Sequence, residues 1–167
     1  MSALHTAVLN AFQSQQWSYR EVPGMEVVES SFEAYHGKVL LHVQSFGEAQ
    51  IVSVVANVSL AVPASHKARS AELLMRANKE LNLGAFEMEW DSGVVMFRQA
   101  NLFPKDHAAE DLIASLVHNV ILEADRMTPF LGELCRTSQA MLPLLDLPQL
   151  LLREDLLPPA PDIEGKS

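Results

Sequence analysis

The sequence predicts an α+β fold with a mostly antiparallel sheet, in the order helix, antiparallel strands, helix, β-hairpin and long helix. Three segments show helical periodicity. Short β-type runs separated by glycine-containing breaks lie between the first two of these segments, and a hairpin lies between the second and the third. Because helices and strands do not alternate strictly, this order disfavours a doubly wound parallel sheet.

The composition is that of one globular domain. The 167 residues are 49% hydrophobic and 20% charged, well away from the composition of disordered chains. Towards the C-terminus leucine is interspersed with repeated proline, and the last residues are polar. We therefore predict a single α+β domain at residues 1–142, a Leu/Pro-rich packing segment at 143–157 and a disordered tail at 158–167.

Charge and cysteine content restrict the partners and the compartment. The net charge is −9 and only 12 lysines and arginines are scattered along the chain, which argues against nucleic acid and acidic membrane surfaces as partners. A transmembrane helix would need roughly 18 or more consecutive apolar residues, and no such stretch occurs. The single cysteine, Cys135, cannot form an intramolecular disulfide, and the N-terminus lacks the features of a signal peptide. A cytoplasmic protein is predicted.

The first helix is predicted at residues 3–15, and the second begins after Pro63. Proline suits the first turn of a helix because its missing N–H has no intrahelical partner there. The apolar stripe of the first helix comprises Leu4, Ala7, Val8, Ala11 and Phe12. The stripe predicted for the second helix comprises Ala68, Ala71, Leu74, Met75, Asn78 and Leu81.

The third helix is predicted to begin after Pro104, with Asp106 as its N-cap. Pro129 is expected to kink or break it near Thr128, because the proline ring clashes with the preceding turn. Its predicted buried stripe comprises Leu112, Leu116, Val117, Val120 and Ile121.

Several predicted strands are apolar on both faces. The runs VLLHV, IVSVV and VVMF carry apolar residues at both parities, whereas an antiparallel sheet with one wet face should alternate. The sequence therefore predicts that both faces of the sheet are covered. Either the chain covers the second face itself, with the third helix and the Leu-rich tail, or a second copy or a peptide from another protein covers it.

A candidate interface follows from this pattern. It is one face of the sheet or its opposite, and strand parity alone does not choose between them. Trp90, beside the predicted turn, suits either an adaptable contact with a partner or a core position under the second helix. The candidate interface residues are Val39, Leu41, Val43, Val52, Val54, Val95, Phe97 and Trp90.

No local pattern supports catalysis, a metal or a cofactor. HExxH, CxxC, GxSxG, GxGxxG and P-loop motifs are all absent, so no catalytic, metal-binding or cofactor-binding residue is predicted and the chain is expected not to be an enzyme. The alternative is a small-molecule sensor or enzyme with a pocket between sheet and helices, lined by groups such as His42, Glu87 or Arg98. A third possibility is that LPQLLLREDLL in the tail is a short motif that docks into another protein.

Three features together resemble the YbjN-type domain. They are the amphipathic first helix leading into WSYREV, the block VANVSLAVPASHKARSAELLMRANKELNLGAFEMEWDSGVVMFR, and Asp125 four residues before Pro129. The resemblance spans residues 3–131 and leaves the Leu/Pro-rich tail outside it.

The resemblance implies both a fold and a mode of action. Such domains are similar in fold to type III secretion chaperones, which dimerise and bind an extended segment of a client protein. The family label, a bacterial sensory transduction regulator, implies a regulatory role. We therefore expect a non-enzymatic, homodimeric protein-interaction module, chaperone-like or regulatory, whose partners are a second copy and an extended segment of a client.

Overall fold

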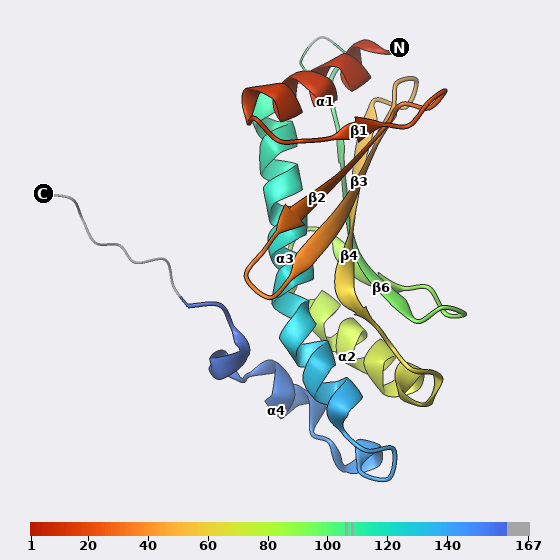
Figure 1. Cartoon of the computed structure of the whole chain (residues 1–167), viewed down its shortest axis with the longest axis vertical. Helices are drawn as coiled ribbons and strands as arrows, with labels where there is room; N and C mark the ends of the chain where they lie inside the picture. Colours follow the sequence, from red (N-terminus) through yellow and green to blue (C-terminus); the bar gives the residue numbers. More distant parts are fainter. Residues whose placement is uncertain (106, 108, 160–167) are drawn as a thin grey trace, which may run out of the picture.

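The fold is a six-stranded sheet with helices on one face and at one end (Figure 1). The computed structural model describes residues 1–105, 107 and 109–159. Every strand pair is antiparallel, and the order across the sheet is β1-β2-β3-β4-β6-β5. The strands are β1 (Arg20–Glu21), β2 (Val27–Glu33), β3 (Lys38–Phe46), β4 (Ile51–Ala61), β5 (Ala85–Met88) and β6 (Val94–Leu102). The predicted α+β order is therefore confirmed.

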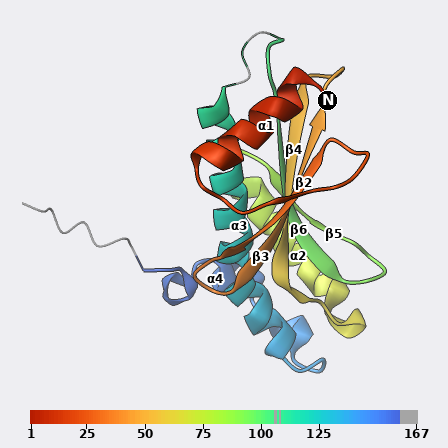
Figure 2. The same ribbon diagram turned by 45° about the horizontal axis from the view of Figure 1, so that its top comes forward.

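Two helices, α1 (Ala3–Ser14) and α3 (Glu110–Arg136), lie on the same side of the sheet (Figure 2). The predicted stripe of α1 is buried throughout, and the hydroxyl of Ser2 caps the helix by accepting from the His5 N–H at 3.1 Å. Phe12 from this stripe packs edge-on against Trp17 and Tyr19. The first helix thus covers the end of the hydrophobic core that lies next to β3.

The long helix α3 departs from the prediction at both its start and its middle. It begins at Glu110 with Ala109 as its N-cap, and the predicted N-cap Asp106 lies outside the described residues. Leu112 is exposed, but the other four residues of the predicted stripe are buried.

Of the kink or break expected at Pro129, the break does not occur: α3 continues to Arg136. An interior proline costs about 3 kcal/mol. Burial of Met127, Phe130 and Leu131 on both sides of the proline stabilises the helix by roughly 1.5 to 3 kcal/mol per side chain, which exceeds that cost.

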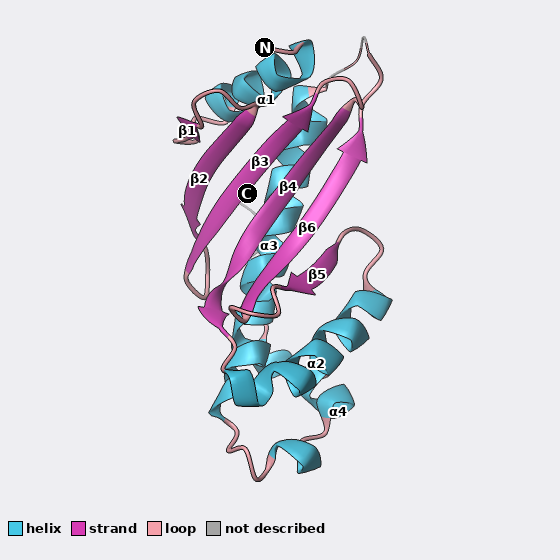
Figure 3. Ribbon diagram, turned by 90° about the vertical axis from the view of Figure 1, so that its right-hand side faces the viewer, coloured by secondary structure: helices cyan, strands magenta, loops and turns pink. Residues whose placement is uncertain are grey.

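The second helix, α2 (Lys67–Glu80), follows a 3-10 turn, η1 (Ala64–His66), and its buried residues share only Leu74 with the predicted stripe. Met75 is 73% exposed, whereas Ser70, Leu73 and Leu74 are buried. Ser70 is polar but buried. Counting apolar residues therefore favoured the neighbouring stripe over the one that is buried. This helix lies beyond the end of the sheet (Figure 3).

The C-terminal segment lies beside α2 and continues the core. It forms the short elements η2 (Leu142–Leu144), α4 (Leu147–Leu151) and η3 (Glu154–Leu156). Leu142, Leu147 and Leu150 are buried in the same hydrophobic cluster as the sheet and α3. Of the predicted tail at 158–167, residues 160–167 lie outside the described residues.

Burial alternates along β3 and β6, so the expectation that the chain itself covers the second face of the sheet was wrong, and its cover by another molecule stays a prediction. In β3 the odd-numbered residues from Val39 to Ser45 are buried, while Leu40 and His42 are exposed. The third helix covers one face only, and the Leu-rich segment packs at the end of the sheet instead of crossing the second face (Figure 3). The second face, which we call the open face, has no helix over it in the part of the chain that the structure describes.

Candidate functional site

The open face carries ordered rows of side chains, because antiparallel pairing places partner residues of adjacent strands side by side. The central row consists of Glu29, His42, Val55 and Arg98, from β2, β3, β4 and β6. The next row consists of Ser31, Leu40, Asn57 and Met96. On the other side of the central row lie Gln44, Ser53 and Ala100, followed by Phe46, Ile51 and Leu102.

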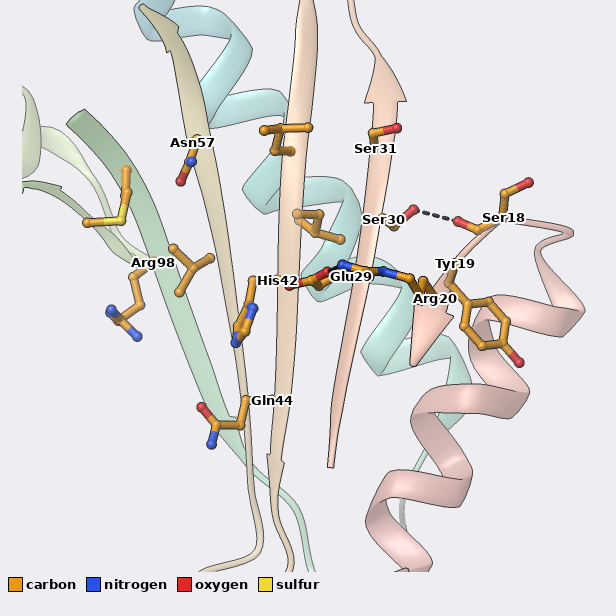
Figure 4. A pocket seen from close by; sticks show the side chains of 14 residues that line it. Ser18, Tyr19, Arg20, Glu29, Ser30, Ser31, His42, Gln44, Asn57 and Arg98 are labelled. Carbon is orange, nitrogen blue, oxygen red and sulfur yellow. Dashed lines mark hydrogen bonds and ion pairs between the residues drawn. The ribbon is translucent and has the colours of Figure 1, made fainter. Parts of the chain in front are cut away.

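These rows line a broad hollow of about 840 Å³ (Figure 4). The segment leading into β1, residues 18–20, stands along one side of it, and β6 lies along the other. Ser30 fixes that segment, because its hydroxyl donates to the Ser18 carbonyl at 2.6 Å. The hollow is lined by Ser18, Tyr19, Arg20, Glu29, Ser30, Ser31, Leu40, Leu41, His42, Gln44, Val55, Asn57, Met96 and Arg98.

The floor of the hollow is partly apolar. Leu40 is 53% exposed, and Val55 and Met96 are half-buried. The three side chains come from three adjacent strands and project to the same side of the sheet. Exposed apolar surface of this kind, bordered by polar groups, is typical of an interaction site.

Ion pairs flank this floor on both sides. Arg20 pairs with Glu29 at the β1–β2 side, and at the other side the Arg98 Nε donates to Glu87 Oε1 at 2.9 Å. A second nitrogen of Arg98, Nη1, lies 3.4 Å from the Ser53 hydroxyl. Exposed pairs of this kind contribute roughly 0 to 1 kcal/mol each. Their charged groups can therefore re-pair with an incoming partner at little cost.

The residues predicted as an interface lie on the covered face, with the exception of Trp90. Val39, Leu41 and Val43 are 0 to 3% exposed, as are the four from β4 and β6: Val52, Val54, Val95 and Phe97. They form the core under α1 and α3, so in this fold they are not available to a partner. The open face, with Leu40, Val55 and Met96, is the opposite face of the same strands, which strand parity had left as the alternative.

Trp90 lies elsewhere, in the turn between β5 and β6, where it is 57% exposed. Lys67 Nζ donates to the Asp91 carbonyl at 2.9 Å, which ties this turn to the start of α2. Trp90 is therefore not a core residue under α2, and its part in an interface stays a prediction.

The polar groups named for a small-molecule pocket come together on the open face. His42 and Arg98 line the hollow, and Glu87 reaches it through its ion pair with Arg98. They do not lie between the sheet and the helices, where the pocket was predicted. Among the described residues, no three His, Cys, Asp or Glu side chains are grouped so as to hold a metal ion.

Comparison with protein families identifies the family of the chain. The family model YbjN, described as "Putative bacterial sensory transduction regulator", matches residues 5–133. The chain belongs to the YbjN family. This confirms the family resemblance, and α4 with its neighbouring residues lies beyond the matched part of this YbjN-family chain. A sequence comparison with curated proteins found no match.

The fold of this YbjN-family chain is similar to a solved structure, the crystal structure of the ExsC–ExsE complex. The TM-score is 0.53 at 11% sequence identity, and the alignment covers 83% of this chain and 100% of that chain. At this identity the likeness concerns the fold alone. It confirms the α+β fold expected from the family resemblance, like that of type III secretion chaperones. None of the helices in the described residues is both long and apolar enough to span a membrane.

Proposed function

We propose that this YbjN-family chain acts by binding other proteins, without catalysis, and that the open face holds an extended segment of a partner. The observation that carries the proposal is the hollow, with its apolar floor between two ion-paired sides. In an extended segment successive side chains point to opposite sides, so every second one would enter the hollow. Its backbone groups could bond to the polar side chains His42, Gln44 and Asn57 around the floor.

The shape of the hollow favours a polypeptide over a small molecule. Small-molecule sites bury about 70 to 90% of the ligand surface in a cleft. No helix lies over this face of the sheet in the described part of the chain (Figure 3), so a small ligand in the hollow would stay largely exposed. An extended segment crossing several strands would cover the apolar floor more completely.

The charge of the open face supports the same proposal. The chain as a whole carries a net charge of −9. On the open face, however, basic and acidic side chains are equal in number: Arg20, Lys38 and Arg98 against Glu29, Glu33 and Glu87. A balanced face does not repel an acidic client as the rest of the surface would.

The test is a substitution on the floor of the hollow. Leu40→Glu should weaken binding of a peptide selected on the wild-type protein from a displayed library of random dodecamers by about tenfold or more, as measured by calorimetry. Stability should change by about 0.5 kcal/mol or less, because Leu40 is half exposed. Leu122→Glu is the matched control, since Leu122 is 65% exposed on the outer side of α3. Equal binding by the two variants would contradict the proposal.

We also propose that two copies associate through a surface that includes Trp90. Trp90 is 57% exposed, and tryptophan, with tyrosine and arginine, is enriched among the residues that contribute most to binding at protein interfaces. Light scattering at tens of micromolar should give the mass of a dimer, and Trp90→Ser should shift the mass towards that of a monomer. A wild-type protein that is strictly monomeric at this concentration would contradict the dimer while leaving the client site untouched.

A further inference from the structure

A second surface lies at the far end of the molecule, where α4 is docked against α2 (Figure 3). The sequence of α4, Leu-Pro-Gln-Leu-Leu, places leucines at i, i+3 and i+4. Leu147 and Leu150 are buried, and Leu151 packs half-buried against the core. This is the pattern by which an amphipathic helix inserts into a groove. The groove opens into a hollow that is lined by residues of α2, β5 and α3 and by Pro148, Leu151 and Leu152.

Few polar contacts hold the segment in place. Arg69 of α2 donates from Nε to the Leu142 carbonyl at 3.1 Å, and a second nitrogen of the same guanidinium donates to the Leu145 carbonyl. At the other end, Arg153 Nη1 lies 3.1 Å from Glu133 Oε2 of α3. A helix of 5 residues is unstable alone, so α4 is helical because the groove holds it.

The groove is longer than the helix that occupies it. A hollow of about 540 Å³ continues from Leu151 and Leu152 along the last turn of α2. Its apolar lining includes Leu81, Phe86 and Met127. A helix with one or two more turns than α4 would therefore bury more of this lining than α4 does.

The rim of the hollow is basic for so acidic a chain. Arg76, Lys79 and Arg126 line it, together with Glu80 and Glu123. Burial raises the pKa of the Glu123 carboxyl, and Arg126, 3.9 Å away, only partly offsets this. With three basic against two acidic side chains, the rim carries an excess of one positive charge, which favours acidic side chains on whatever lies in the groove.

We propose that this groove binds an amphipathic helix of another protein, with leucines at i, i+3 and i+4 and acidic side chains on its flank. In the isolated chain, α4 occupies the groove as a tethered competitor. The partner helix displaces α4 and extends further along α2. The family match ends at residue 133, so the competitor lies outside the matched domain whereas the walls of the groove lie inside it.

The test uses the full chain and a fluorescent peptide of its own residues 142–157. Leu147→Ala combined with Leu150→Ala should loosen α4, and the double variant should bind the peptide at least tenfold more tightly than the wild type. Leu144→Ala, at a position 74% exposed in η2 and outside the lining of the hollow, is the matched control and should bind as the wild type does. Adding Arg126→Glu to the double variant should weaken binding of the acidic peptide again. Equal binding by the wild type and the double variant would overturn the proposal.

A second route does not depend on the double variant folding. A protease site is inserted at Gln139, in the exposed link between α3 and η2, and the folded protein is cleaved there. The released C-terminal fragment should separate on gel filtration, and the remaining folded protein should bind the peptide. If the remainder unfolds once the fragment leaves, α4 is an integral part of the fold and the proposal fails.

Discussion

Replacing Gly93 with alanine is expected to lower the free energy of unfolding by about 3 kcal/mol. Gly93 has a φ of +75°, in the left-handed region, and a Cβ there would lie 2.1 Å from the Val62 carbonyl oxygen. The Val62 N–H donates to the Gly93 carbonyl at 2.8 Å, so the turn between β5 and β6 is tied to the end of β4. The added methyl would push these two segments apart. Urea denaturation followed by circular dichroism measures the loss.

Gly24→Ala is the matched control. Gly24 has the same φ of +75°, but a Cβ there would meet nothing within 4 Å. Only the backbone strain remains, and the expected loss is about 1 kcal/mol. If the two variants lost equal stability, the close approach of Gly93 to Val62 would not matter to the fold.

Asp125→Ala is expected to cost about 3 kcal/mol, because it removes the acceptor of two hydrogen bonds from a buried position. The Asp125 carboxylate in the middle of α3 is 5% exposed. One oxygen accepts from the His36 N–H at 2.8 Å, and the other lies 3.1 Å from the His36 Nδ1. These contacts fasten the hairpin between β2 and β3 to α3. Thermal and urea denaturation should both show the loss.

His36→Ala separates the two contacts. It removes the ring but keeps the backbone N–H that bonds to Asp125, so we expect a loss of only about 1 kcal/mol. A loss for Asp125→Ala as small as that for His36→Ala would show that the buried carboxylate is not needed to hold the hairpin.

The element order could be predicted because the sequence carries it locally. The stripe of α1 and the glycines between the strands are strong short-range signals. That the helix continues through Pro129 could not be predicted from the sequence, because this depends on burial along the whole of α3. The buried stripe of α2 was predicted only in part for a related reason: a buried serine at position 70 interrupts the apolar stripe.

The candidate site was predicted only in part. The sequence showed that the strands have apolar residues at both parities, but not that Leu40 and His42 of β3 share their face with Val55 of β4 and Arg98 of β6. That arrangement depends on the register between β3, β4 and β6, which joins residues far apart in the chain. Only the three-dimensional pairing shows the second face to be a mixed, open surface instead of a second covered one.

Site-specific photo-crosslinking tests the central claim most directly. A benzoylphenylalanine is placed at His42 on the open face in one variant, and at Ser115 on the exposed side of α3 in another. Each variant is irradiated with the library-selected peptide. The account predicts efficient crosslinking from position 42 and none above background from position 115. Crosslinking from position 115 with none from position 42 would contradict it.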